Sequence, residues 1–295
     1  MHKRRWNALK LELVVEPRAP LLIKSGLASP NPSLPDMQFV RTMTPRGETV
    51  FIPGSSLKGT FRSFTEKVLR TVKSDGACEP FPSSSSYCVT RYRLADEEDP
   101  AKVYQKSCRA CRIYGNTRLK GRLSFTDAFP DGEVKTETRY GVAISRLTNA
   151  VAVGPFDIEV LVQGRFRTAL VLENFEVWQV GLLALTLQAI NDGLVKLGFG
   201  KNRGFGKVSM TVEQAVVEMA KKPGLLRNAI WGVGAYVGDE ERQAYGLQDT
   251  DRMEELPEGT ETDLGVFIRR TYSQEAWKQI AEKAIASIAK TLEAA

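Results

Sequence analysis

Four cysteines lie in one stretch of the 295-residue sequence, at Cys78, Cys88, Cys108 and Cys111. In a cytoplasmic protein, such a set indicates a metal site rather than disulfides. Four thiolates are sufficient for a closed tetrahedral zinc site, which leaves no position for water and is therefore structural. We expect Zn²⁺ to stabilise an insertion at 73–120, whose apolar content is low. Four unconnected buried thiols are the alternative.

The N-terminal sequence MHKRRWNALKLELVV alternates apolar and charged residues after its basic start. A signal peptide needs a continuous apolar stretch, which this pattern does not provide. We also find no apolar run long enough to cross a bilayer. The sequence therefore predicts a cytoplasmic protein without a membrane partner.

Charge is distributed unevenly along the chain, whose formal net charge is +6. The segment 239–263 carries ten acids against Arg242 and Arg252, a net charge of −8, so the remainder is +14. The segment 100–126 has seven Lys or Arg residues and no acid. A basic body of this kind suits a polyanionic partner, with an ordinary solvated surface as the alternative.

His2 is the single histidine of the sequence. Histidine-dependent RNA cleavage, Ser-His-Asp hydrolysis and His-ligated metal chemistry therefore lack their usual proton carrier or ligand.

Hydrophobic periodicity predicts two β-α-β units. In the first, an alternating strand at 9–13 is followed by a proline-rich, irregular segment at 17–47 and a helix after Gly54. That helix has an apolar stripe made of Leu57, Phe61, Phe64, Val68 and Val72. Strands at 122–128 and 165–174, a helix at 177–190 and a strand after Lys207 complete the pattern. The order predicts an α+β fold with a ferredoxin-like or RNA-recognition-motif core, βαββαβ.

This pattern divides the chain into a core at 1–220 and a C-terminal extension at 221–295. Within the core we expect the cysteine insertion at 73–120 and an extended excursion at 134–162. The extension contains the acidic segment and a helix opened by Ser273. Its apolar stripe, which predicts packing on the core, comprises Trp277, Ile280, Ala281, Ala284, Ile288 and Leu292.

Two glycine-containing stretches are candidates for anion binding. In PGSSLKGTFRS, a helix start carries Lys58 and Arg62 one turn apart, a pattern that suits phosphate. The second, GFGKNRGFGK, follows a helix and opens a strand, which is the reverse of a dinucleotide fingerprint. A Walker loop is excluded because neither stretch ends in Gly-Lys-Ser/Thr. A flexible loop with nearby Lys and Arg remains, and plain turn chemistry is its alternative.

Four motifs occur in a fixed order: IPGSSLKGTFRS after a strand, CRACRIYG followed by GRLSFTDA, ETRYGVAISRLTNA, and LGFGKNRGFGKV. Together they closely resemble the RAMP superfamily, specifically the repeated backbone subunit of type III CRISPR effector complexes. The resemblance covers 9–211. The cysteine-bearing insertion is similar to the zinc-containing version of the type III-D branch.

The resemblance implies a modified RNA-recognition fold that binds guide RNA, which pairs with target RNA. Further copies or paralogous backbone subunits, and large and small subunits, would be partners. A hairpin at 134–162 would act as a thumb that kinks the guide. The RNA-binding residues implied by the motifs are Ser55, Ser56, Lys58, Arg62, Arg139, Arg146, Gly200, Lys201 and Arg203.

The resemblance also implies cleavage of target RNA. Active family members have an aspartate in the loop before the first helix, and PDMQFVR places Asp36 there. The chemistry would be attack of a 2′-hydroxyl on its own phosphate with Mg²⁺ or Mn²⁺. The alternatives are a non-catalytic guide-binding scaffold or end-capping subunit, in which Asp36 is a solvated loop residue, and a precursor-processing nuclease, which the histidine content disfavours. Asp127, at a strand end, is expected to be structural.

Overall fold

The structure is a computed structural model that describes residues 3–26, 35–45 and 47–293, with side chains described up to residue 288. His2 and the side chain of Leu292 lie outside this part. The central elements follow in the order β1 (Asn7–Pro17), α1 (Gly54–Val72), β4 (Leu123–Phe125), β8 (Phe166–Glu173), α5 (Val177–Asn191) and β9 (Val208–Ala220). The chain is therefore mixed α/β.

Three further groups of elements complete the chain. A short hairpin, β2 (Arg41–Thr44) and β3 (Gly47–Val50), precedes α1. The cysteine insertion contains α2 (Cys88–Arg91), η1 (Leu94–Asp96), α3 (Pro100–Lys106) and α4 (Arg109–Tyr114), and is followed after β4 by β5 (Phe129–Pro130), β6 (Lys135–Ile144) and β7 (Val151–Gln163). The C-terminal extension comprises β10 (Ile230–Trp231), η2 (Val233–Ala235), α6 (Asp239–Tyr245), β11 (Arg252–Met253), β12 (Thr260–Asp263), β13 (Phe267–Ser273) and α7 (Gln274–Glu293).

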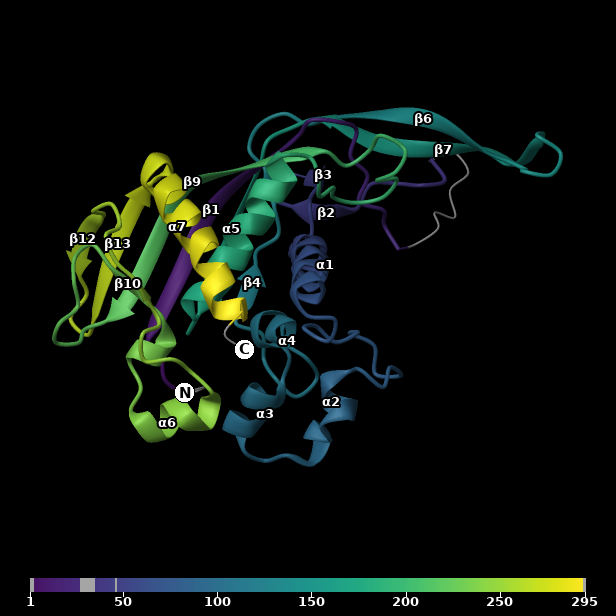
Figure 1. Cartoon of the computed structure of the whole chain (residues 1–295). Coiled ribbons are helices and arrows are strands. Elements are labelled where there is room, and N and C mark those ends of the chain that lie inside the picture. The colour runs from purple at the N-terminus through teal and green to yellow at the C-terminus, as the bar shows by residue number, and fades with distance from the viewer. Residues whose placement is uncertain (1–2, 27–34, 46, 294–295) are drawn as a thin grey trace.

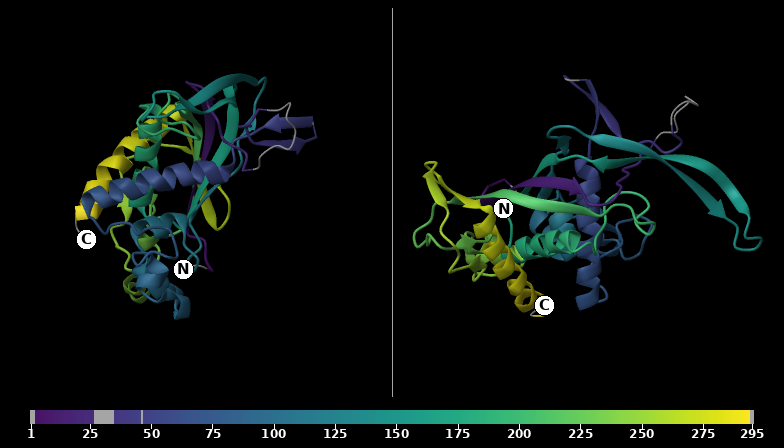
Figure 2. Two further views of the ribbon diagram at one scale, coloured as in Figure 1. Left: turned by 90° about the vertical axis from the view of Figure 1, so that its right-hand side faces the viewer. Right: turned by 90° about the horizontal axis from the view of Figure 1, so that it is seen from above.

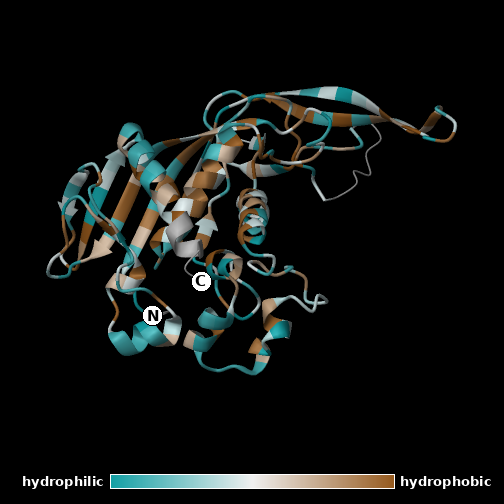
Figure 3. Ribbon diagram, viewed as in Figure 1, coloured by the Kyte–Doolittle hydropathy of each residue, from teal (hydrophilic) through white to brown (hydrophobic). Residues whose placement is uncertain are grey.

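An antiparallel sheet with the strand order β12-β13-β9-β1-β8-β4 forms the centre of the molecule, and β5 also pairs with β8. Helices α1, α5 and α7 cover one face of this sheet (Figures 1 and 2). Alternation along β1 buries Leu9, Leu11 and Leu13 beneath the helices and turns Lys10 and Glu12 to the opposite face. Helix α5 is largely hydrophobic on the side seen in Figure 3, and most of its residues are buried because it packs against both the sheet and α7.

The β6–β7 hairpin extends away from the sheet (Figure 1). Its outer part exposes large hydrophobic side chains, including Leu147 at 96 % and Tyr140 at 77 %. At its base, Leu161 exchanges backbone hydrogen bonds with Leu21, just after β1. The hairpin is thus fixed at one end of the sheet.

Two expectations need correction. The segment 17–47 is not wholly irregular, because β2 and β3 pair from Arg41 to Val50 after the last closely spaced prolines. The cysteine insertion is also not poor in buried apolar side chains. Tyr87, Leu94 and Tyr104 form a second core with residues of the extension, among them Val233, Val237, Tyr245 and Leu247. The sequence did not reveal this core because its halves are more than a hundred residues apart.

The extension beyond 220 continues the main sheet. Strand β13 pairs with β9, and Trp277, Ile280 and Ala284 of α7 are buried in the main core. Among the described residues, no helix combines the length and the hydrophobicity needed to cross a lipid bilayer.

Candidate functional site

A groove of about 690 Å³ lies between α1 and the loop that joins α5 to β9. From α1 it is lined by residues at helical spacing, namely Ser56, Gly59, Thr60, Ser63, Phe64 and Lys67. From the loop it is lined by Leu194, Val195, Lys196, Gly198, Lys201 and Asn202. The two glycine-containing stretches singled out in the sequence therefore face one another, although 140 positions separate them.

Three lysines line this groove, from both of its sides. The pKa of Lys201 is lowered by partial burial and by the charge of Lys67. Lys196 donates from Nζ to the carbonyl oxygen of Lys201 at 2.8 Å. An anion placed beside Lys201 and Lys67 would offset the repulsion between their charges. The groove is thus suited to a phosphate backbone.

The stretch GFGKNRGFGK at 198–207, the glycine loop, needs glycine at the positions where its backbone lies close to other backbone atoms. Gly198 has φ +78°, and a Cβ there would lie 2.2 Å from the Leu22 carbonyl oxygen. Gly206 has φ +85°, and its Cβ would lie 2.1 Å from the Leu197 carbonyl oxygen. Hydrogen bonds from Phe199 N to Leu22 O and from Gly206 N to Pro20 O attach the loop to the segment after β1.

The start of α1 differs from the simple anion site that its sequence suggested. The Gly54 N–H donates to Asp127 Oδ1 at 2.7 Å, and the Ser56 N–H donates to Pro53 O at 2.9 Å. Asp127 thus satisfies part of the helix start and adds a negative charge there. The basic groove lies along the flank of α1 rather than at its end.

The predicted residues of α1 occupy different places. Ser56 lines the groove, whereas Ser55 is exposed in the first turn. Lys58 is half-buried, and its pKa is lowered by burial and by the charge of Arg62. Arg62 itself points to the cysteine insertion, as described below. The structure therefore brings Ser56, but not Arg62, together with the glycine loop.

Two of the predicted arginines, Arg139 of the hairpin and Arg203 of the glycine loop, lie near aromatic rings of that loop. The Arg139 guanidinium lies 5.9 Å from the ring centroid of Phe205, and its Nε donates to Glu137 Oε1 at 2.7 Å. In the same loop Arg203 lies 5.8 Å from the ring of Phe199, and its N–H donates to Gly200 O. Arg146 is exposed in the turn between β6 and β7. The base of the hairpin thus adjoins the glycine loop.

Asp36 is exposed beside the hairpin. Its Oδ2 accepts a hydrogen bond from the Asp157 N–H of β7 at 3.0 Å. The next residue, Met37, forms a parallel bridge with Ile158. These contacts fix the backbone at Asp36 and orient its carboxylate.

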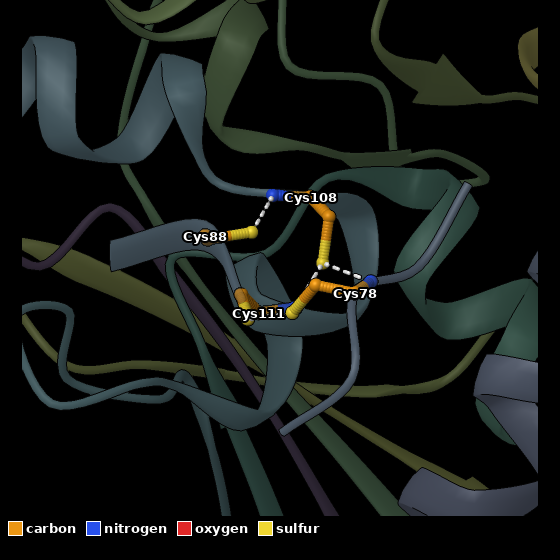
Figure 4. A group of neighbouring side chains, drawn as sticks. All are labelled: Cys78, Cys88, Cys108 and Cys111. Atoms are coloured by element: carbon orange, nitrogen blue, oxygen red, sulfur yellow. Dashed lines mark hydrogen bonds between the residues drawn. The ribbon is translucent and has the colours of Figure 1, made fainter. Parts of the chain in front are cut away.

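The four cysteines converge (Figure 4). Their Sγ atoms all lie within 4.8 Å of one another, with Cys78 and Cys111 at 3.5 Å and Cys78 and Cys108 at 3.7 Å. Zn–S bonds of about 2.3 Å in a tetrahedron place sulfur atoms about 3.8 Å apart. The cysteines form no disulfide, and they could bind a metal such as zinc.

Backbone N–H groups approach the cysteine sulfur atoms, and hydrogen bonds favour the thiolate form of Cys108. The N–H of Cys108 lies 3.2 Å from Cys88 Sγ, and the N–H groups of Cys78 and Cys111 each lie 3.5 Å from Cys108 Sγ. Hydrogen bonds from Cys111, Cys78 and Cys88 lower the pKa of Cys108 well below its usual value, whereas the bond to Cys108 raises the pKa of Cys111. The donor set therefore fits a thiolate-bound metal.

Arg62 lies against this cluster rather than in the groove. Its Nη2 is 3.9 Å from Cys111 Sγ, and its Nη1 donates to the Gly115 carbonyl oxygen at 3.1 Å. Other arginines near the insertion also bind backbone. Arg112 donates to Ser107 O and Gln105 O, and Arg118 donates to Leu94 O and Glu97 O. Two of the seven basic residues at 100–126 therefore bind the backbone of the insertion itself.

Sequence reasoning missed Lys67 and Lys196 as groove residues. A signal for Lys67 was present, since Ser56, Thr60, Ser63 and Lys67 recur every three or four positions along α1. Lys196 had no such signal, because its position depends on how the glycine loop folds back.

No curated protein sequence matches the chain. The model of the RAMP superfamily matches residues 15–209, which include the end of β1, the cysteine insertion, the hairpin and the glycine loop. This match spans well over half of the sequence, and the chain therefore belongs to the RAMP superfamily.

Proposed function

We propose that the protein is a backbone subunit of a type III CRISPR ribonucleoprotein, which binds guide RNA and cleaves complementary target RNA through Asp36. The RAMP superfamily is associated with CRISPR complexes and RNA binding. The observation that carries the proposal is the basic groove between α1 and the glycine loop. Its lysines and closely approaching backbone suit a single-stranded phosphate backbone without base readout.

The strand order supports an RNA-recognition type of core. If β1, β4, β8 and β9 are the four strands of a βαββαβ unit, their order in the sheet is fourth, first, third, second, all antiparallel. We therefore assign a modified ferredoxin-like core with two additions, the cysteine insertion and the β6–β7 hairpin. The latter would be the thumb that kinks the guide, with Arg139 and Arg146 as its RNA contacts.

The proposed guide contacts are Ser55, Ser56, Lys58, Gly200, Lys201 and Arg203, and we add Lys67 and Lys196 because they line the same groove. The cysteines would bind structural Zn²⁺, as in the type III-D-like version of the subunit. Target RNA, further backbone copies, and the large and small subunits of the complex would be the remaining partners, in the cytoplasm.

Asp36 is the proposed catalytic residue. Its exposed carboxylate, oriented by the Asp157 N–H, would position the attacking 2′-hydroxyl or coordinate Mg²⁺ or Mn²⁺ beside the scissile phosphate. The 2′-hydroxyl would lose its proton to solvent as its oxygen bonds to phosphorus, and the 5′-oxygen would leave and take up a proton, which yields a cyclic phosphate and a 5′-hydroxyl. The bound cation would neutralise developing charge on the phosphate. In the alternative function, a non-catalytic scaffold or end-capping subunit, the groove is retained and Asp36 has no chemical role.

The assembled complex with guide RNA, Mg²⁺ and labelled target distinguishes these functions. Asp36→Asn keeps an acceptor for the Asp157 N–H but removes the charge, whereas Asp36→Ala removes both. We expect both variants to bind target normally and to cleave it about 10²–10⁴-fold more slowly. Asp249→Asn, an exposed acid of the extension, is the matched control. Unchanged cleavage in both Asp36 variants would leave the scaffold function.

A further inference from the structure

Arg62 of α1 lies between the helix and the cysteine cluster, where its side chain is 21 % exposed. We propose that Arg62 is a positioning residue of the metal centre, which balances thiolate charge and fixes the metal-binding segments to α1, and that it is not an RNA contact. The inference rests on the proposed binding of Zn²⁺ by the four cysteines.

Three partners occupy the Arg62 guanidinium. Nε donates to Glu66 Oε1 at 2.8 Å, Nη1 donates to Gly115 O at 3.1 Å, and Nη2 lies 3.9 Å from Cys111 Sγ. Gly115 directly follows α4, the helix that contains Cys111. One side chain thus contacts both a cysteine sulfur and the end of the helix that presents it.

The electrostatic setting matches this role. Four thiolates bound to Zn²⁺ leave a net negative charge, which is costly when partly buried unless a cation lies nearby. Arginine is protonated at any ordinary pH, and Arg62 places such a cation beside Cys111.

Glu66 connects Arg62 to a second arginine of α1. Its Oε2 lies 3.5 Å from Arg70 Nη2, and Arg70 donates to Ala77 O at 3.1 Å and to Cys78 O at 2.6 Å. Arg62, Glu66 and Arg70 follow one another at intervals of four along the helix. At one end of this row Arg70 binds the segment that contains Cys78, and at the other end Arg62 binds the end of α4.

Helix α1 therefore has two rows of polar residues, one facing the groove and the other facing the cysteine cluster. Lys67 belongs to the row that lines the groove, whereas Arg62 belongs to the row that contacts the cysteine cluster. Loss of a groove lysine should weaken RNA binding and leave the metal unaffected. Loss of Arg62 should do the reverse.

The test uses the full-length, zinc-loaded protein and two readouts. The first is the rate of Zn²⁺ release to a chromogenic chelator. The second is the affinity for single-stranded oligouridylate over a range of salt concentrations. The variants are Arg62→Gln, Arg62→Lys and, as matched control, Lys67→Gln.

We expect Arg62→Gln to release Zn²⁺ about 10–100-fold faster than the parent protein, the range typical for partners of metal ligands. Arg62→Lys keeps the charge but cannot bind all three partners, so an intermediate rate is expected. It also keeps the test valid if Arg62→Gln does not fold. Both should retain the parental salt slope, whereas Lys67→Gln should reduce it by about 0.7 and release Zn²⁺ at the parental rate.

Parental release rates in both Arg62 variants, or a salt slope reduced as in Lys67→Gln, would overturn the role of Arg62 while leaving the metal centre intact. A parent protein that binds no Zn²⁺ would instead refute the proposed metal centre, and this inference with it. Metal content of the parent protein therefore separates the two failures.

Discussion

The Asp127 carboxylate accepts a hydrogen bond from the Gly54 N–H at 2.7 Å, which joins the strand end after β4 to the start of α1. A Cβ at residue 54 would lie 2.7 Å from the Phe125 carbonyl oxygen, so glycine is required for this close approach. The relationship fixes the helix that forms one wall of the groove.

Replacement of Asp127 tests this cap. Asp127→Ala removes the acceptor and should lower the free energy of unfolding by about 0.5–2 kcal/mol, the usual cost of a lost helix cap. Asp127→Asn keeps a side-chain oxygen as acceptor, so its free energy of unfolding should fall by less. Urea unfolding of both variants measures the difference, and equal losses would show that charge rather than the hydrogen bond matters.

The glycine loop offers a matched pair of substitutions. Gly204 and Gly206 both have φ +85°, but a Cβ at Gly204 meets nothing within 4 Å, whereas a Cβ at Gly206 would lie 2.1 Å from Leu197 O. Gly204→Ala should lower the free energy of unfolding by about 1–2 kcal/mol, because alanine is strained at this positive φ. Gly206→Ala should cost clearly more in urea unfolding and also weaken RNA binding. Similar losses in the two variants would contradict the steric argument.

Lys67 and Lys201 should contribute to RNA affinity through charge. We expect Lys67→Gln and Lys201→Gln each to weaken binding of single-stranded RNA at low salt and to reduce the slope of log K against log salt by about 0.7. Lys278→Gln removes a lysine from α7, where it pairs with Glu275, and is the control. Unchanged slopes in both groove variants would exclude the groove as the phosphate site.

These residues show how much the sequence could predict. Periodicity identified α1 and the burial of Leu57 and Phe61, because such spacing reports the local helix. It overextended the apolar stripe, since Phe64 lines the groove and Val72 is 51 % exposed. The sequence could predict the cysteine cluster because four nearby cysteines are a typical ligand set for zinc. The four Sγ atoms lie close enough together to bind a metal ion.

The missed features depend on contacts between distant segments. The family motifs imply an RNA contact for Arg62, and the sequence gives no sign that its guanidinium contacts Gly115 and Cys111, about fifty residues later. The sequence predicts packing of the terminal helix on the core, but it gives no sign that Tyr245 and Leu247 of the acidic segment pack against the cysteine insertion. Local pattern cannot predict which of several basic residues a later segment will bind.

Asp251 predicts a pH dependence of stability. Burial and the charge of Glu176 raise the pKa of Asp251 from 3.8 to about 7. Hydrogen bonds from the N–H groups of Val177 and Gly234, and the charge of Arg122, act in the opposite direction but are weaker. The folded state therefore retains a proton that the unfolded state has lost. The contribution of Asp251 is greatest below pH 3.8 and declines as the pH rises to about 7.

Asp251→Asn removes this titration. The stability of the variant relative to the parent protein should therefore increase between about pH 5 and pH 7.5, whatever constant cost the substitution adds. Urea unfolding of both proteins at several pH values measures this difference. A difference that does not vary with pH would show that Asp251 stays charged in the folded state.

Removal of the metal should affect one half of the insertion more than the other. Residues 76–93 contribute only Tyr87 and the two cysteines Cys78 and Cys88 to the second core, whereas 94–120 contribute more of its apolar side chains, among them Leu94, Val103, Tyr104 and Leu119. We therefore expect chelation to open the first half while the second half stays folded. In limited proteolysis with trypsin, the exposed Arg91 and Arg93 should become early cleavage sites, and residues beyond Arg112 should stay protected.

Two controls make this proteolysis specific. Added Zn²⁺ should restore the parental pattern, and Cys88→Ser, which removes one ligand, should be cut at the same sites without a chelator. Cleavage spread evenly over 73–120 would mean that the second core does not support the insertion without metal. An unchanged pattern after verified metal loss would mean that packing alone maintains the cysteine cluster, because no bond to a metal is then needed to keep these thiols together.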